Sequence, residues 1–184
     1  MTPLAVHITG ASGAGVSTLG RALAERTGAT QLDTDDFYWL PVEPRFTQER
    51  TVEERLSLIE NAMDGAGAGG WILSGSIGNW GEPLLRRISL VVFVRTATAI
   101  RLARLEVRER ALFGAAIDPG GARREQHNWF IQWAGDYDTG TKEGRSLALH
   151  EAFLASLSCP ALRVDGAEPI ESLVDQVIAS LGST

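Results

Sequence analysis

A glycine-rich segment near the amino terminus constrains the fold of this chain more than any other feature. It reads Gly10-Ala11-Ser12-Gly13-Ala14-Gly15-Val16-Ser17-Thr18 and follows a short apolar run. Gly10, Gly15 and Ser17 match the spacing of the pattern G-x-x-x-x-G-K-[ST]. Small residues let successive backbone N–H groups turn inward around a phosphate, and a helix starting near Ser17 adds its positive end. The spacing predicts a strand, a phosphate-binding loop and a helix, with the Ser17 hydroxyl placed to hold Mg²⁺.

The loop departs from this pattern at Val16, which stands at the position of the phosphate-binding lysine. Loss of one donor that stabilises a transition state costs about 10²–10³-fold in rate. Three interpretations therefore stay open. An arginine replaces the lysine, or the chain binds nucleotide without rapid transfer, or the loop binds no nucleotide.

A dinucleotide-binding turn is a competing interpretation of the same glycines. The pattern G-x-G-x-x-G would require a third glycine where Thr18 stands. The Tyr-x-x-x-Lys pair of short-chain dehydrogenases is also absent, because the only lysine, Lys142, follows Tyr137 at a different spacing. We therefore rank this interpretation below a phosphate loop.

Short apolar runs alternate with helical patterns along the rest of the chain. The runs are Leu4–Thr9, Thr30–Asp33, Trp71–Ser74, Leu90–Val94 and Ala161–Val164. The helical patterns are Ser17–Thr27, Thr51–Met63, Ala97–Phe113, Arg145–Leu157 and Ile170–Leu181. In the third of these, the side chains expected on the apolar face are Ile100, Leu102, Leu105 and Leu112. This alternation predicts a parallel sheet with helices on both faces, whose ligands bind beyond the carboxyl ends of the strands.

An acidic cluster follows the second apolar run. Asp33, Asp35 and Asp36 would repel one another unless a cation or substrate donors share them. Carboxylate oxygens suit Mg²⁺, and a carboxylate can also accept a proton from an attacking hydroxyl. The alternatives are a helix cap and, in the dinucleotide interpretation, a ribose-binding acid. The aromatic residues Phe37–Trp39 come next, either as core or as a surface that stacks a substrate ring.

With these motifs in place, the sequence resembles the P-loop small-molecule and nucleoside monophosphate kinases, especially shikimate-kinase-like and adenylate-kinase-like proteins. Gly10–Thr18 resembles their phosphate loop, and Asp33-Thr34-Asp35 is similar to the Asp-x-Asp with which shikimate kinases hold substrate and support Mg²⁺. Trp71–Ser76 resembles their third strand and its substrate-side turn. The likeness covers most of the chain in order.

Two further matches lie in the second half of the chain. Arg104 and Arg108, on the helix that follows Val92–Val94, resemble the arginine pair with which adenylate kinases contact adenine and phosphate. They are four residues apart and so share one helix face; a solvated basic face is the alternative. Val164–Pro169 resembles the last strand and the loop that passes the adenine.

The resemblance implies a three-layer α/β/α P-loop NTPase fold, with about five parallel strands and a small helical lid. It implies one domain over residues 1–184, with a core formed by 1–36, 70–112 and 145–184. Residues 37–69 would form an acceptor-side insertion and residues 113–144 a lid-like segment, for which Gly114–Gly121 is either a hinge or a plain loop.

The resemblance also assigns roles to residues, with ATP and Mg²⁺ as the implied cofactors. The catalytic candidates are Asp33, Asp35 and Arg108, and the metal-binding candidates are Ser17, Asp33 and Asp35. The nucleotide would be held by Gly10, Ser12, Gly13, Ala14, Gly15, Val16, Ser17, Thr18, Arg104, Arg108 and Gly166. The acceptor would be held by Asp35, Trp39, Gly75, Ser76 and Trp80.

The chain departs from the family beyond Val16. Ser74 stands where adenylate kinases carry a metal-supporting aspartate, and residues 37–70 show no nucleoside monophosphate signature. Three arginines there, Arg45, Arg50 and Arg55, fit either an anionic acceptor or, as we prefer, a solvated helix face. Arg108 or Arg110 is the candidate to replace the lysine charge. We interpret His7 and His150 as structural; for His127 we prefer the same interpretation to a role as acid or base.

Composition excludes several classes of function. A formal net charge of −6 argues against a nucleic-acid partner, and no apolar stretch approaches the ~20 residues of a membrane span. Cys159 is alone, so neither an intramolecular disulfide nor a zinc cluster is expected. We predict a cytoplasmic ATP-dependent phosphotransferase that acts on a small hydroxyl-bearing or phosphate-bearing molecule, its oligomeric state left open. The alternatives are a degenerate P-loop protein that binds nucleotide without turnover and, ranked third, a dinucleotide-binding oxidoreductase.

Overall fold

Five parallel strands form one sheet in the computed structural model, which describes residues 3–140 and 145–182. The strands are β1 (Leu4–Gly10), β2 (Thr30–Asp33), β3 (Gly70–Ser74), β4 (Leu90–Arg95) and β5 (Ala161–Asp165). Their order is β2-β3-β1-β4-β5, so the connections leave the central strand β1 in opposite directions. Such a switch point leaves room for a ligand at the carboxyl edge of an open sheet.

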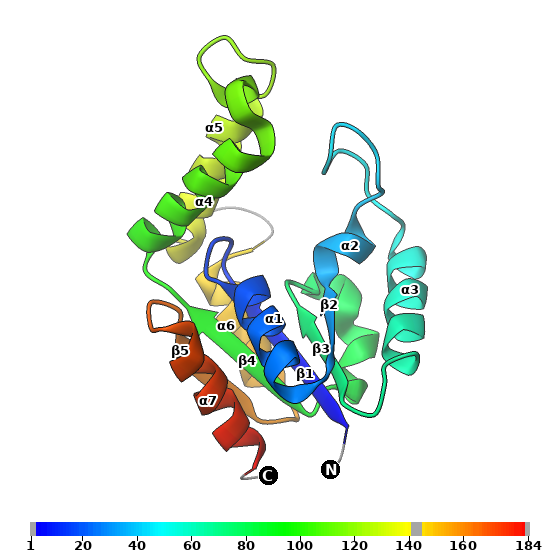
Figure 1. Ribbon diagram of the computed structural model, residues 1–184. Coiled ribbons are helices and arrows are strands. Elements are labelled where there is room, and N and C mark those ends of the chain that lie inside the picture. Colours follow the sequence, from blue (N-terminus) through cyan, green and yellow to red (C-terminus); the bar gives the residue numbers. More distant parts are fainter. Residues whose placement is uncertain (1–2, 141–144, 183–184) are drawn as a thin grey trace.

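Helices cover both faces of the sheet (Figure 1). On one face, α1 (Val16–Thr27) and α7 (Ile170–Leu181) pack over the apolar side chains of β1 and β4. On the other face lie α3 (Val52–Asp64), η1 (Gly78–Arg87) and α6 (Leu147–Ser156). The predicted three-layer architecture is confirmed.

Two segments extend beyond the carboxyl edge of the sheet, one on each side of the loop that follows β1 (Figure 1). The first is a helical hairpin formed by α4 (Thr98–Phe113), η2 (Gly114–Ile117) and α5 (Arg124–Gly135), which ends in η3 (Asp136–Asp138). The second comprises α2 (Thr34–Tyr38) and residues 39–50. Lys142 lies outside the described residues.

The apolar face predicted for α4 is largely wrong. Of its four expected residues only Leu105 is buried, whereas Ile100 and Leu112 are exposed. The reason is that α4 packs mainly against η2 and α5 and does not lie flat on the sheet. Arg101 instead occupies a fully buried position at the base of the hairpin.

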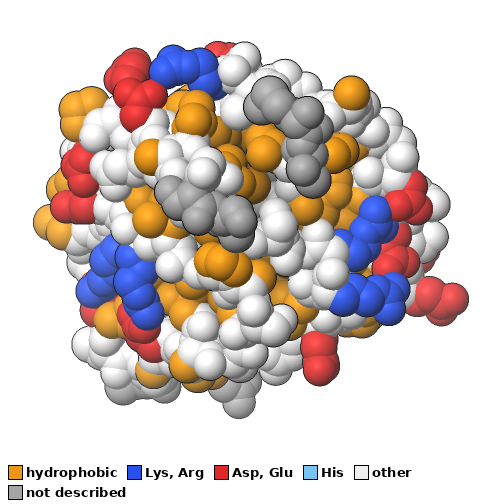
Figure 2. Space-filling view, turned by 90° about the horizontal axis from the view of Figure 1, so that it is seen from below, with side chains coloured by type: hydrophobic (Ala, Val, Ile, Leu, Met, Phe, Trp, Pro, Cys, Tyr) orange, Lys and Arg blue, Asp and Glu red, His pale blue; other side chains and the backbone are white. Residues whose placement is uncertain are grey.

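The opposite end of the molecule, at the amino ends of the strands, carries hydrophobic side chains at its centre and charged ones around them (Figure 2). Strand β1 begins and helix α7 ends on this side (Figure 1). Among the described residues, none of the helices has the length and hydropathy needed to cross a membrane.

A close contact between α1 and β3 supports a first prediction. A Cβ atom added at Gly20 would lie 1.9 Å from Ser74 Oγ, which is fully buried. Alanine favours a helix by about 1 kcal/mol over glycine, but overpacking a core costs about 1–3 kcal/mol. We expect Gly20→Ala to lower the free energy of unfolding in urea by up to about 2 kcal/mol, the overpacking cost less the gain in helix propensity. Gly67→Ala, whose added Cβ meets nothing within 4 Å, is the control; a stabilised Gly20→Ala protein would contradict the contact.

Candidate functional site

The loop between β1 and α1 has the geometry of an anion-binding nest. Gly13 and Gly15 have positive φ angles of 79° and 102°, which turn the backbone back on itself. Gly15 is the N-cap of α1, where no side chain caps the helix and no acidic residue occupies the first turn. The first N–H groups of α1 therefore have no side-chain partner and add the positive end of the helix dipole. This is the arrangement predicted from the glycine spacing.

A cavity of about 2140 Å³ opens above this loop, between the helical hairpin and the segment that carries α2. It exceeds the ~300–1,000 Å³ of a typical small-molecule pocket, so it offers room for two ligands. Every residue predicted for the site borders it except Gly166: the loop 10–18, Asp33, Asp35, Trp39, Gly75, Ser76, Trp80, Arg104 and Arg108. The structure thus gathers these residues in one place, while their individual roles stay predictions.

Gly166 reaches the loop through its backbone. The Arg104 guanidinium donates to the carbonyl oxygens of Gly166, at 2.9 Å, and of Ala14, at 3.3 Å. The Thr96 hydroxyl donates to the same Ala14 carbonyl at 3.0 Å. Arg104 therefore joins the phosphate loop to the loop that follows β5.

The two candidate aspartates differ in their surroundings. Asp33 Oδ1 accepts a hydrogen bond from the Asp35 backbone N–H at 3.1 Å, which is the helix-cap alternative. The Asp35 side chain is exposed and borders the cavity. Desolvation there raises its pKa, the charge of Asp33 raises it further, and the charges of Arg145 and Arg108 oppose the rise. Asp35 is therefore a carboxylate electrostatically coupled to two arginines in the cavity.

Arg145 is a site residue that the sequence analysis missed. Its Nη1 donates to Ser12 Oγ of the phosphate loop at 3.4 Å, and its guanidinium carbon lies 6.0 Å from the centre of the Trp133 ring. Burial lowers its pKa, and Asp35 raises it. Arg145 directly precedes Ser146, the N-cap of α6. A cation at that end of a helix opposes the dipole, and this anomaly could have drawn attention to it.

Only one of the two arginines proposed to replace the lysine faces the cavity. Arg108 borders it, with its guanidinium carbon 5.7 Å from the centre of the Phe130 ring. Arg110 pairs with Asp118 at 2.6 Å and donates to the Gly114 carbonyl at 2.8 Å, away from the cavity. Arg108 therefore remains a candidate to supply the charge of the missing lysine. Arg145 becomes a second candidate, and Arg110 is no longer one.

We had expected the three arginines on the acceptor side to form a solvated helix face, but two of them do not. Arg55 is only 5% exposed; it pairs with Glu49 at 2.8 Å, and its guanidinium carbon lies 3.6 Å from the Tyr38 ring centre. Arg50 donates to three carbonyls at the end of α2, those of Asp36, Phe37 and Trp39. Both side chains brace this wall from within, whereas Arg45 is exposed beside Phe46.

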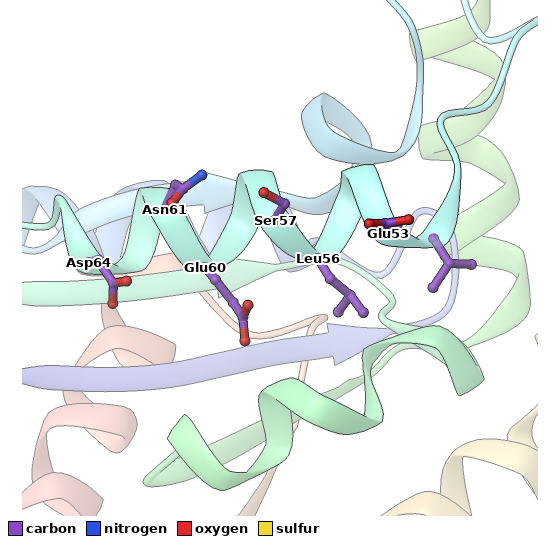
Figure 3. A pocket seen from close by; sticks show the side chains of 7 residues that line it. Glu53, Leu56, Ser57, Glu60, Asn61 and Asp64 are labelled. Atoms are coloured by element: carbon purple, nitrogen blue, oxygen red, sulfur yellow. The ribbon is translucent and has the colours of Figure 1, made fainter.

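A second hollow, of about 630 Å³, runs along α3 (Figure 3). Its carboxylates Glu60 and Asp64 pair with Arg86 and Arg87 of η1. It contains no residue of the phosphate loop. We therefore take the larger cavity as the candidate active site. Among the described residues, no group of three or more His, Cys, Asp or Glu could hold a metal ion.

Two histidines are buried beneath the cavity, as their structural interpretation requires. His7 Nδ1 shares a hydrogen bond with the Leu73 carbonyl at 3.1 Å. His150 bridges Tyr137 Oη at 2.6 Å and Thr9 Oγ1 at 3.4 Å. Burial lowers the pKa of each to about 4, and Arg145 contributes at His150. His127 is buried between Glu106 and Glu109, at 3.2 and 3.7 Å, and joins α5 to α4.

The two low pKa values predict acid sensitivity. Because an unfolded histidine has a pKa near 6.5, the unfolded state binds more protons than the folded state between about pH 6.5 and pH 4. These histidines should not affect the free energy of unfolding above pH 6.5. As the pH is lowered from 6.5 to 4, that free energy should decrease by about 3 kcal/mol per histidine, and below pH 4 their effect should level off. Urea unfolding at a series of pH values measures the loss. His150→Gln should show a smaller loss than the parent protein, and an equal loss would contradict the assignment.

The sheet order, the nest and the helix that follows it define a P-loop NTPase fold. Solved structures with the same fold include shikimate kinase from Bacteroides thetaiotaomicron, with a TM-score of 0.55, 19% identity, and coverage of 97% of this chain and 98% of that chain. A gluconokinase from Sinorhizobium meliloti 1021 has a TM-score of 0.52 and 16% identity, with coverage of 98% and 93%. At these identities the likeness concerns the fold alone.

Sequence comparison defines the family. The sequence model described as an AAA domain matches residues 6–112, which hold the phosphate loop, Asp35 and the arginine pair of α4. The uncharacterized protein YqaC of Bacillus subtilis (strain 168) is 43% identical over 178 residues, which cover 97% of each chain. The chain belongs to this AAA-domain family of P-loop proteins.

Proposed function

We propose that this protein is an ATP-dependent phosphotransferase whose acceptor is a small hydroxyl-bearing molecule. The observation that carries the proposal is one cavity that joins an uncapped phosphate-binding nest to a carboxylate and two arginines. A nest alone would serve a nucleotide sensor. A carboxylate coupled to cations beside the nest also equips the cavity for proton acceptance during transfer.

The proposed roles follow from position. The N–H groups of the loop 10–18 and Arg104 hold the nucleotide, which supplies the phosphoryl group. The Ser17 hydroxyl and the Asp33 carboxylate would hold Mg²⁺, which would offset negative charge on the phosphates during transfer. Asp35 accepts the proton of the acceptor hydroxyl, and its raised pKa brings it nearer to the working pH of a general base. Arg108 and Arg145 supply the charge that the lysine would provide.

The proposed domain organisation follows from the same positions. Residues 37–69 would contribute the acceptor wall, and residues 113–144 would form the lid over the nucleotide; of the latter segment the structure describes residues 113–140. A cavity open enough for two ligands is consistent with closure on binding. We expect the reaction to take place in the cytoplasm, with nucleotide and acceptor as the partners.

A second candidate is nucleotide binding without turnover. Val16 in the loop and Ser74 at the end of β3 favour it, because both replace residues that family members use on phosphate and metal. The two functions share the nest and differ in whether transfer occurs. Kinetics therefore decides between them.

Titration calorimetry with ATP, with and without Mg²⁺, tests the proposal first. We expect Mg²⁺-dependent binding that Ser17→Ala weakens at least about tenfold, with Ser57→Ala on the outer face of α3 as the control. An acceptor screen that follows ADP release comes next, and EDTA should abolish any turnover. Binding without release for every acceptor supports the second candidate. The absence of nucleotide binding contradicts both.

A further inference from the structure

Two backbone N–H groups of the phosphate loop are not used by the loop itself. The Ala14 N–H closes a turn onto the Ala11 carbonyl at 3.0 Å. Within the described chain, the N–H groups of Gly13 and Gly15 donate to no protein acceptor, and both glycines border the cavity. A phosphate held by a nest receives such N–H groups. Its affinity therefore depends on how firmly these two peptide groups are held and how strongly they are polarised.

Each of these N–H groups shares its peptide group with a carbonyl that an arginine of α4 contacts. The Ser12 carbonyl, which belongs to the first peptide group, accepts a hydrogen bond from Arg101 Nη1 at 3.4 Å. The Ala14 carbonyl, which belongs to the second, accepts one from Arg104 Nη1 at 3.3 Å. In a trans peptide group the carbonyl and the N–H point in opposite directions. A cation at the carbonyl oxygen polarises the peptide group and makes its N–H a stronger donor on the other side.

The Ala14 carbonyl has a second, neutral donor. The Thr96 hydroxyl donates to it at 3.0 Å, and Thr96 is buried and does not border the cavity. Thr96 therefore has no direct access to a ligand in the cavity. The Arg104 guanidinium is itself held by the Gly166 carbonyl at 2.9 Å. One peptide group of the nest is thus fixed by a neutral donor and a cationic donor, which mutation can separate.

The loop lies against the backbone of α4 with no room for a side chain between them. A Cβ atom added at Gly13 would lie 2.6 Å from the Arg101 carbonyl oxygen. Arg101 is fully buried, so its guanidinium acts on the loop from behind and not from within the cavity. A binding site that is held in place before its ligand arrives loses little conformational freedom on binding. The contact with α4 therefore favours a rigid nest.

From these contacts we infer that Arg101 and Arg104 are positioning residues, which orient and polarise the two glycine peptide groups that receive the nucleotide phosphates. This inference rests on the proposed function and refines the role of Arg104 in it. It differs from the role in the resemblance, where the arginine pair of this helix contacts adenine and phosphate directly. Part of the positive potential that the loop lacks at Val16 reaches the phosphates through the backbone.

Inorganic tripolyphosphate tests this inference, because it carries a phosphate chain and no base. Calorimetry with Mg²⁺ gives its Kd and that of ATP for each variant, after urea unfolding has shown that the variant is folded. Arg104→Met should weaken both ligands by the same factor, about tenfold, and Arg104→Lys should restore part of the loss. Thr96→Val should weaken both several-fold. The matched controls Arg26→Met and Thr27→Val, which remove an exposed ion pair and a threonine-to-carbonyl hydrogen bond at the end of α1, should change neither Kd.

Three results would overturn the inference. If Arg104→Met weakened ATP and left tripolyphosphate unchanged, Arg104 would contact the base. If Arg104→Met weakened both ligands and Thr96→Val weakened neither, Arg104 would act on the phosphates directly. If the parent protein bound neither ligand, the inference and the proposed function would fail together. The expected pattern in a protein that releases no ADP with any acceptor would contradict the phosphotransfer alone and support the positioning role.

Discussion

Replacement of Arg145 by methionine should lower kcat at least about 100-fold in a protein that stays folded. The loop has no lysine at Val16, so another cation has to stabilise charge on the transferred group. Arg145 touches the loop at Ser12 Oγ and acts electrostatically on Asp35. Methionine retains much of the apolar stem and removes only the guanidinium. Steady-state ADP release with the acceptor found in the screen measures the effect.

Two variants make the Arg145 prediction specific. Val16→Lys in the Arg145→Met background should recover part of the lost activity, because it returns a cation to the loop. Arg86→Met, whose partner is Glu60 on the remote face of α3, should retain full activity. If kcat is unchanged in Arg145→Met, Arg108 alone carries the charge and the assignment to Arg145 fails.

The strands could be predicted because the sequences of buried parallel strands are short, continuous runs of apolar residues. All five agree with the structure to within one residue at each end. The helix that begins at Val16 could be predicted equally well, since Leu19, Leu23 and Ala24 form one buried face. Together these local signals determine the α/β class and the placement of the phosphate loop.

Tertiary contacts explain what the pattern missed. Ile100 and Leu112 looked like core residues because periodicity cannot tell which surface a helix will meet, and α4 meets a second helix beyond the sheet. Arg55 looked solvated because arginine is usually exposed. A long apolar stem and an aromatic partner allow its burial, as over Tyr38.

Arg145 could not have been placed by local reasoning. It lies more than 130 residues from Ser12 in the sequence, and they meet only because α6 begins beside the carboxyl edge of the sheet. Most of the predicted site residues were found because the motif positions place them at the ends of strands. A residue that enters the site from a returning helix has no such anchor, apart from its unfavourable place before a helix.

Arg101→Met should lower the free energy of unfolding by about 2–4 kcal/mol, because two buried carbonyl groups lose their donor and each such loss costs about 1–3 kcal/mol. The Arg101 side chain is fully buried, and burial lowers its pKa while Asp138 opposes the shift. Its guanidinium donates to the carbonyls of Thr96 at 3.1 Å and Ala134 at 3.0 Å. It also reaches the Ser12 carbonyl at 3.4 Å. Methionine would leave these carbonyls buried without a donor.

The position of Arg101 makes the effect structural as well as energetic. Its contacts join the phosphate loop, the end of α5 and η3, so they fix the helical hairpin to the core. In a chain of this size 1 kcal/mol corresponds to about 2–4 °C in Tm, so Tm should fall by roughly 10 °C. Thermal and urea unfolding measure the loss, and hydrogen exchange should show its largest increase at Ala134 and its neighbours.

Arg110→Met provides the matched control for Arg101. Its partner Asp118 is about half exposed, and exposed ion pairs contribute about 0–1 kcal/mol. Both variants lose one arginine of the same helix and one aspartate contact. The difference between their free energies of unfolding therefore measures the effect of burying the arginine. If Arg101→Met cost no more than Arg110→Met, water or Arg95 would have to satisfy Asp138 and the carbonyls, and the hairpin would owe its attachment to apolar packing.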